Sequence, residues 1–182
     1  MTESANRVSA LARRSQAVNG MRIVGIDGPS GSGKSTLARA VAAQLDCPVI
    51  KIDDFVSWGD LSGWWPRFDE QVLAPLLDGR DAHYQQRDWV GDEFGTGLGE
   101  WRTVAWHPLV VFEGVTTTRR ESVGQLSLAV WVEAPDEVRL ARGLARDGED
   151  HRELWEDWMR REAEFFGADR PRARADLVVP GY

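Results

Sequence analysis

The sequence predicts an α/β fold, in which helices cover both faces of a parallel sheet to give a three-layer sandwich. Short apolar runs, typical of buried strands, alternate along the chain with segments whose apolar residues recur at helical spacing. Strands separated by helices favour parallel pairing, because the crossover helices bury both faces of the sheet. The apolar runs are residues 23–26, 48–52, 109–112, 126–132 and 176–179.

The helical segments lie between these strands. Apolar residues at helical spacing predict helices over residues 37–45, 68–77, 136–146 and 153–166. Residues 57–107 are rich in Gly and Trp and show weak periodicity, so we expect an irregular insertion there. The first 20 residues indicate a short helix or a frayed lead-in. The expected organisation is therefore a lead-in at residues 1–20 and a single domain at residues 21–182.

The composition limits the classes of protein to which the chain can belong. With 182 residues, 42% of them hydrophobic, the chain is long enough for one domain whose core needs no disulfides. The single cysteine, Cys47, cannot form a disulfide within the chain, which indicates a reducing cytoplasm. No apolar run reaches membrane length, and a net charge of −7 disfavours a broad nucleic-acid surface. We expect a cytoplasmic protein without nucleic-acid or membrane partners, and its oligomeric state stays open.

The most informative segment is residues 28–36, Gly-Pro-Ser-Gly-Ser-Gly-Lys-Ser-Thr. Gly28, four further residues and then Gly33-Lys34-Ser35 match the phosphate-binding loop pattern, between a predicted strand and a predicted helix. Glycines let backbone N–H groups converge on phosphate oxygens, and the helix N-terminus attracts the same anion. A plain Gly/Ser turn is the alternative. The pattern predicts a nucleoside triphosphate site made of Gly28, Ser30, Gly31, Ser32, Gly33, Lys34, Ser35 and Thr36.

Acidic residues follow two of the predicted strands. Asp53 and Asp54 come after the second strand, and Glu113 follows the strand at residues 109–112. Ligands of such sheets bind beyond the carboxyl ends of the strands. Phosphoryl transfer needs a carboxylate that accepts the proton of the attacking hydroxyl and oxygen ligands for Mg²⁺. The acidic residues therefore predict this chemistry beside Ser35, although a helix cap or a solvated strand end is the alternative.

Taken together, these segments resemble the uridine kinase family of P-loop kinases, which is related to phosphoribulokinase and bacterial pantothenate kinase. The resemblance implies a P-loop NTPase fold and a transferase that uses ATP and Mg²⁺ to phosphorylate a hydroxyl of a small molecule, above all a nucleoside. It extends from about residue 22 to the end of the chain. Besides residues 28–36, it is carried by Ile52-Asp53-Asp54-Phe55, Phe68-Asp69, Phe112-Glu113-Gly114, Arg139-Leu-Ala-Arg142, Arg146-Asp147 and residues 175–180.

The resemblance also implies roles for individual residues. Asp53 would be the base toward the acceptor hydroxyl, and Lys34 would contact the β- and γ-phosphates. The Mg²⁺ ligands would be Ser35, Glu113 and Asp53. Residues 139–152 would form a lid in which Arg142 and Arg146 approach the transferring phosphoryl group, with Arg139 on the same helix face. A solvated, ion-paired helix face is the alternative for these arginines.

The chain departs from the family pattern where the acceptor binds. Val56 stands in place of a tyrosine that packs against the base, and residues 63–66 stand in place of the ribose-binding aspartate. Asp60 is the nearest substitute for that aspartate. Tyr84 matches the aromatic wall of the family, and Trp89 lies near the position of a histidine.

Tryptophan is unusually frequent, with nine in the chain. Six of them lie in the insertion, where they either wall a pocket or form a small satellite core. Among these, Trp64 and Trp65 are the candidate substrate contacts. Trp155 and Trp158, in the predicted helix at residues 153–166, are expected to pack in the core.

Three functions remain open from the sequence. The first is the small-molecule kinase already described. The second is a nucleoside-monophosphate kinase, for which Arg67, Arg80 and Arg87 would bind the phosphate of the acceptor. The third is an ATPase or nucleotide-dependent switch without an acceptor. Such ATPases usually end this strand in Asp-Glu, whereas here Glu113 follows Phe112.

Overall fold

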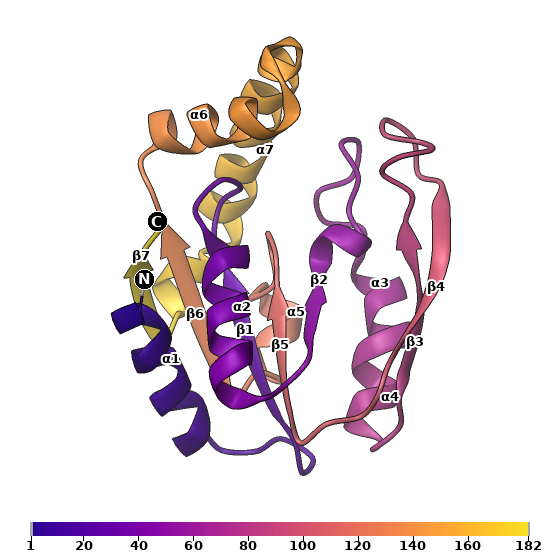
Figure 1. The fold of residues 1–182 in the computed structure, drawn as a ribbon, viewed down its shortest axis with the longest axis vertical. Helices are drawn as coiled ribbons and strands as arrows, with labels where there is room; N and C mark the ends of the chain where they lie inside the picture. The colour runs from indigo at the N-terminus through magenta and orange to yellow at the C-terminus, as the bar shows by residue number, and fades with distance from the viewer. Residues whose placement is uncertain (1, 182) are drawn as a thin grey trace.

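The computed structural model describes residues 2–181, so Met1 and Tyr182, the outer ends of the expected lead-in and domain, lie outside the described residues. Five parallel strands form one sheet in the order β2-β5-β1-β6-β7 (Figure 1). Each predicted apolar run forms a strand, within two residues of the predicted ends. The strands are β1 (Arg22–Asp27), β2 (Val49–Lys51), β5 (Leu109–Glu113), β6 (Leu128–Glu133) and β7 (Leu177–Pro180).

The predicted helices are also confirmed, and the first residues adopt the helical alternative. The α-helices are α1 (Thr2–Arg14), α2 (Lys34–Leu45), α3 (Trp65–Phe68), α4 (Ala74–Leu77), α5 (Arg120–Val123), α6 (Asp136–Asp147), α7 (Arg152–Asp169) and α8 (Pro171–Arg174). A π-helical turn, η2 (Asp69–Leu73), joins α3 to α4, and 3₁₀ turns form at η1 (Ile52–Asp54) and η3 (Glu149–His151).

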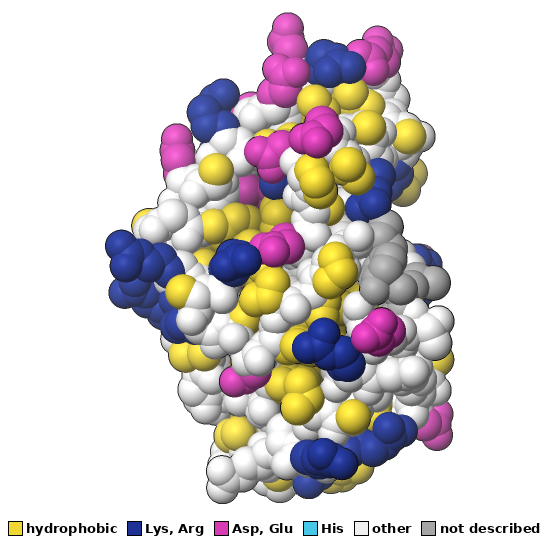
Figure 2. All heavy atoms as spheres, turned by 90° about the vertical axis from the view of Figure 1, so that its left-hand side faces the viewer, with side chains coloured by type: hydrophobic (Ala, Val, Ile, Leu, Met, Phe, Trp, Pro, Cys, Tyr) yellow, Lys and Arg dark blue, Asp and Glu magenta, His cyan; other side chains and the backbone are white. Residues whose placement is uncertain are grey.

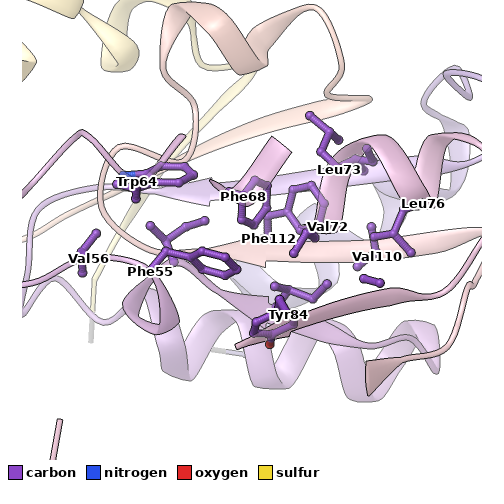
Figure 3. Packing of buried hydrophobic residues seen from close by; sticks show 14 of the residues in the cluster. Phe55, Val56, Trp64, Phe68, Val72, Leu73, Leu76, Tyr84, Val110 and Phe112 are labelled. Atoms are coloured by element: carbon purple, nitrogen blue, oxygen red, sulfur yellow. The ribbon is translucent and has the colours of Figure 1, made fainter. Parts of the chain in front are cut away.

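Both faces of the sheet are covered, because successive side chains of a strand point to opposite faces. Val24 and Ile26 of β1 belong to a cluster that α1 and α2 cover, whereas Ile23 belongs to the cluster on the other face. Helix α1 is part of this core, since Ala5, Val8 and Ala12 are fully buried in it. Apolar residues of η2 and α4 cover the second face, as Figure 3 shows for Val72, Leu73 and Leu76.

The expectation of an irregular insertion was wrong for part of residues 57–107. Two strands, β3 (Ala82–Arg87) and β4 (Leu98–Val104), form an antiparallel hairpin beside α3 and α4 (Figure 1). Ala82, Tyr84 and Arg87 of β3 are buried, with a register shift between Gln85 and Arg87, and most of β4 is exposed. The hairpin therefore lacks the apolar alternation that would have predicted it.

The outer surface is mixed in character. Figure 2 views the molecule from the side of α1, where charged groups separate the hydrophobic side chains, and acidic groups gather toward the end that carries α6 and the start of α7. In residues 2–181, no helix has the length and apolarity needed to span a membrane.

Candidate active site

A cavity of about 520 Å³ lies at the carboxyl ends of β1, β2 and β5. Residues of α6 and α7 line one side, and residues after β3 line the other, consistent with the positions of these elements in Figure 1. His151 Nε2 lies 2.8 Å from Glu93 Oε1 and so joins the two sides. The lining includes Ser30, Gly31, Gly33, Lys34, Ser35, Thr36, Lys51, Asp53, Asp54, Val56, Trp58, Trp89, Glu93, Glu113, Arg146, Asp147, Trp155 and Trp158.

The phosphate loop, residues 28–33, joins β1 to α2. It lies so close to neighbouring backbone that two of its glycines admit no side chain. A Cβ on Gly28 would lie 2.1 Å from the Val132 carbonyl oxygen, and one on Gly31 would lie 2.6 Å from the Arg139 carbonyl oxygen. Of the eight residues predicted to bind nucleotide, Gly28 and Ser32 lie behind the cavity lining, and the other six line it.

Lys34 and Ser35 begin α2 at the floor of the cavity. The buried Lys34 ammonium donates to the Pro29 carbonyl oxygen at 3.0 Å, within the loop. Ser35 Oγ donates to Glu113 Oε1 at 2.9 Å, which joins the first turn of α2 to the end of β5. Burial raises the pKa of Glu113 to about 7, and the nearby charge of Asp53 acts in the same direction.

The two aspartates of η1 lie in different surroundings, although they are neighbours in sequence. The Tyr84 hydroxyl donates to Asp54 Oδ2, and burial raises the pKa of Asp54. The Asp53 carboxylate lines the cavity, and no side-chain hydrogen bond or ion pair engages it within residues 2–181. Both aspartates line the cavity, but Asp53 is the one of the two whose carboxylate oxygens stay available to a ligand.

Lys51 is a cavity residue that the sequence analysis did not identify. It ends β2 and is in register with Glu113 on β5, so the two side chains lie on the same face of the sheet. The signal was weak, because a lysine at the end of a strand is ordinarily a solvated residue.

The oxygen groups at the floor suit Mg²⁺. Kinase sites hold this ion with one or two carboxylates and complete its coordination with water and substrate phosphates. Ser35 Oγ and Glu113 already lie together, and Asp53 is close enough to raise the pKa of Glu113. Within residues 2–181, no group of three or more His, Cys, Asp or Glu side chains could hold a metal by itself.

The arginines of the expected lid differ from one another. Arg139 is buried and donates from Nε to the Ser30 carbonyl oxygen at 2.9 Å, and Arg142 donates to the Gly31 carbonyl oxygen at 3.0 Å. Arg146 alone among the three lines the cavity. Its guanidinium pairs with Asp147 at 2.7 Å. The roles expected of Arg142 and Arg146 stay predictions.

The expected substrate contacts of Trp64 and Trp65 find no support in the geometry. Trp64 is buried in the core, where its Nε1 donates to Thr116 Oγ1 at 3.0 Å, and Trp65 stacks on Phe68. Neither residue lines the cavity. Figure 3 shows Trp64 and Phe68 packed with Phe112 on the sheet.

Four other tryptophans form the aromatic wall of the cavity: Trp58, Trp89, Trp155 and Trp158. The ring of Trp58 lies edge-on to the other three, with ring centroids 5.5 to 6.3 Å apart. The prediction of core packing for Trp155 and Trp158 is therefore incomplete. Both are buried, but they also line the cavity, because the insertion brings Trp58 and Trp89 opposite α7.

The remaining positions named from the sequence do not reach the cavity. Asp60 Oδ1 accepts hydrogen bonds from the backbone of Ser62 and Gly63, so it stabilises a turn. Arg67 donates to the carbonyl oxygens of Gln85 and Asp54. Arg80 pairs with Asp78 on the surface, and the buried Arg87 donates to loop carbonyls, including that of Gly97.

Comparisons with known proteins agree with this geometry. Among solved structures, a possible uridine kinase from Bacillus stearothermophilus matches with a TM-score of 0.73 at 20% identity, over 97% of each chain. A candidate fructose transport system kinase from Silicibacter sp. TM1040 matches with a TM-score of 0.65 at 21% identity, over 99% of this chain and 100% of that one. A shikimate kinase from Acinetobacter baumannii matches with a TM-score of 0.53 at 18% identity, over 90% of this chain and 86% of that one.

These similarities confirm the fold predicted from the sequence, the P-loop NTPase fold of kinases. The sequence model of the AAA domain family matches residues 24–167, a range that includes the phosphate loop, Asp53, Glu113 and the whole of α6. Since the match spans most of the sequence, this chain belongs to the AAA domain family of P-loop proteins.

Proposed function

We propose that the protein is an ATP-dependent kinase that transfers the γ-phosphoryl group to a hydroxyl of a small molecule, with a nucleoside as the expected acceptor class. The observation that carries this proposal is a single cavity that combines the phosphate loop, the free carboxylate of Asp53 and a wall of four tryptophans. In this proposal the nucleotide binds at the phosphate loop, and the acceptor binds beside it, between Asp53 and the tryptophans. The similarity to structures described as kinases supports the same reaction class.

In this proposal, the floor of the cavity holds the nucleotide phosphates. Lys34 leaves the Pro29 carbonyl oxygen to bind the β- and γ-phosphates, and Ser35, Glu113 and Asp53 hold Mg²⁺. When bound, Mg²⁺ neutralises phosphate charge and orients the phosphates. The N-terminus of α2 adds a favourable dipole toward the same anion.

Asp53 acts on the acceptor. Its carboxylate orients the hydroxyl and accepts its proton while the hydroxyl oxygen forms a bond to the γ-phosphorus. The bond between that phosphorus and the β–γ bridging oxygen breaks, and ADP leaves with the bonding electrons. Arg146 is the arginine placed to reach the transferring group, because it lines the cavity near Asp53. Arg142 acts on the phosphate loop through Gly31.

The aromatic wall binds the body of the acceptor. Flat tryptophan rings stack on a base or on the apolar face of a sugar. The similarity to a possible uridine kinase supports a nucleoside. The geometry does not favour a monophosphate acceptor bound by Arg67, Arg80 and Arg87, since none of them lines the cavity.

The test is Mg²⁺- and ATP-dependent release of ADP against a panel of acceptors. The panel contains uridine, cytidine, other nucleosides, nucleoside monophosphates, pantothenate and sugars, together with a reaction that lacks an acceptor. The control is Lys34→Ala. Stimulation by one acceptor class that disappears in the control supports the proposal. Steady ADP release without any acceptor would instead indicate an ATPase or switch.

A further inference from the structure

Ser30, in the phosphate loop, is held by three side chains from α6 and α7. Its backbone N–H donates to Glu162 Oε1 at 2.8 Å. Its carbonyl oxygen accepts from Arg139 Nε at 2.9 Å, and its hydroxyl oxygen accepts from Trp158 Nε1 at 2.9 Å. The hydroxyl and both backbone groups of one loop residue are therefore engaged by Arg139, Trp158 and Glu162, which we call the Ser30 anchor.

Glu162 is the centre of the Ser30 anchor. Only 1% of the residue is exposed, and its carboxylate accepts hydrogen bonds from Ser30, Trp158 and Arg139. The Arg139 guanidinium, which is also buried, lies 2.8 Å from Glu162 Oε2. A buried ion pair loses its hydration, so the pair is weak evidence for stability and is better explained by the geometry that it fixes.

The geometry fixed here is the curve of the phosphate loop. A loop that binds phosphate must present several backbone N–H groups to one anion. The Glu162 carboxylate accepts the hydrogen bond of the Ser30 N–H and so holds this part of the loop against α7. Gly31, the next residue, has a φ of +76° and lies against the backbone of α6 at Arg139, which leaves the loop little freedom to shift.

We propose that Glu162 is a positioning residue for nucleotide binding: through Ser30 and Arg139 it holds the phosphate loop in the shape that receives the β- and γ-phosphates. This inference rests on the proposed function only in requiring a nucleotide at the loop. Since Trp158 also belongs to the aromatic wall, one turn of α7 contacts both the loop and the acceptor end of the cavity.

The test compares Glu162→Gln with Glu164→Gln by isothermal titration of ADP with Mg²⁺ and of AMP. Glu164 lies on the same helix, is exposed and undergoes the same change of charge, so it is the matched control. Glu162→Gln should weaken ADP binding by about 10- to 100-fold, the equivalent of one charge-assisted hydrogen bond. The affinity for AMP, which lacks the β-phosphate, should fall less than the affinity for ADP, so the ratio of ADP to AMP affinity decreases. The control should bind both nucleotides like the wild type.

A purely structural role would lower the melting temperature of the nucleotide-free protein but leave the ratio of ADP to AMP affinity unchanged in the folded fraction. That outcome, or equal ADP binding by Glu162→Gln and wild type, overturns the inference. Failure of the wild type to bind ADP would overturn the proposed nucleotide site itself. If Glu162→Gln does not fold, Trp158→Phe is the deciding variant, because it removes the indole N–H but keeps an aromatic ring at this position and leaves the Glu162–Arg139 pair in place. It should lower the same ratio, and an unchanged ratio counts against the inference.

Discussion

The Tyr84 hydroxyl donates a hydrogen bond of 3.0 Å to Asp54 Oδ2. This contact distinguishes two neighbouring carboxylates, of which the family resemblance of the sequence had already favoured Asp53. Asp54 is turned toward the β3 strand and half-buried, whereas the Asp53 carboxylate keeps its oxygens for a ligand. The relationship makes Asp53 the stronger candidate for proton transfer.

Replacement of Asp53 therefore separates catalysis from nucleotide binding. Asp53→Asn should lower phosphoryl transfer by about 10²- to 10⁴-fold, because the amide cannot accept the proton of the acceptor hydroxyl. ATP affinity should change far less than transfer, since the phosphate loop is intact and Ser35 and Glu113 remain to hold Mg²⁺. Single-turnover rates and ATP titrations provide the two measurements. Asp54→Asn serves as the comparison, and an equal loss of transfer in that variant would contradict the assignment.

A substitution of Lys34 tests whether the nucleotide phosphates bind at the floor of the cavity. Lys34→Ala removes the ammonium that lies against the phosphate loop at the start of α2, so both ATP affinity and turnover should be lost. The fold should stay intact, because the side chain makes a single hydrogen bond, to Pro29. Circular dichroism and ATP titration check the two parts. Normal turnover in this variant would place the nucleotide elsewhere.

A substitution in the aromatic wall tests whether the four tryptophans bind the acceptor. Trp58→Ala removes the ring that contacts Trp89, Trp155 and Trp158, so KM for the acceptor should rise at least ~10-fold while ADP affinity stays within about twofold of the wild type. Trp101→Ala is the matched control, because Trp101 lies in the same insertion but is exposed and stacks on His83 away from the cavity. Equal effects of the two substitutions would mean that the wall does not bind the acceptor.

The sequence was sufficient to predict the strands of the sheet and the residues at the floor of the cavity. Strand ends and the glycine pattern are local signals, and the parallel sheet brings the residues that follow β2 and β5 to one edge. Asp53, Glu113 and Ser35 could therefore be predicted to lie at one edge of the sheet without any tertiary contact, and their roles stay predictions. The adjacency of Ser35 and Glu113 then follows from the position of α2.

The walls of the site could not be predicted in the same way. Tryptophan in a loop signals burial, but which ring lines a cavity depends on how the insertion packs against α7. Trp64 packs on Phe68 in the core, while Trp58 lies edge-on to Trp158 with ring centroids 5.5 Å apart, a contact between distant segments that no periodicity encodes.

The arginines of α6 show the same limit. Their spacing predicts a shared helix face, which does not indicate what that face contacts. Arg139 and Arg142 bind carbonyl oxygens of the phosphate loop, and only Arg146 lines the cavity. Glu162, which completes the Ser30 anchor, carries no sequence signal because it is one of several acidic residues on a charged helix.

Asp27 provides a prediction about pH and stability. It ends β1, is fully buried and accepts hydrogen bonds from the backbone N–H groups of Gly28 and Thr118 at 2.6 and 2.7 Å. Burial raises its pKa from the ordinary value of 3.8 to about 6, although these hydrogen bonds and the charge of Lys34 oppose the shift. Between these two values, the folded protein binds more protons at this site than the unfolded chain does.

The free energy of unfolding should therefore fall as the pH rises through this window. The contribution of Asp27 is fully present below about pH 4 and is lost as the pH passes about 6. Asp27→Asn keeps a hydrogen-bond acceptor but does not titrate, so the wild type should lose up to about 3 kcal/mol relative to this variant across the window. Urea unfolding of both nucleotide-free proteins at several pH values measures the difference. A difference that stays constant with pH would show that the pKa of Asp27 is the same in the folded and unfolded protein, so that its hydrogen bonds and the charge of Lys34 offset its burial.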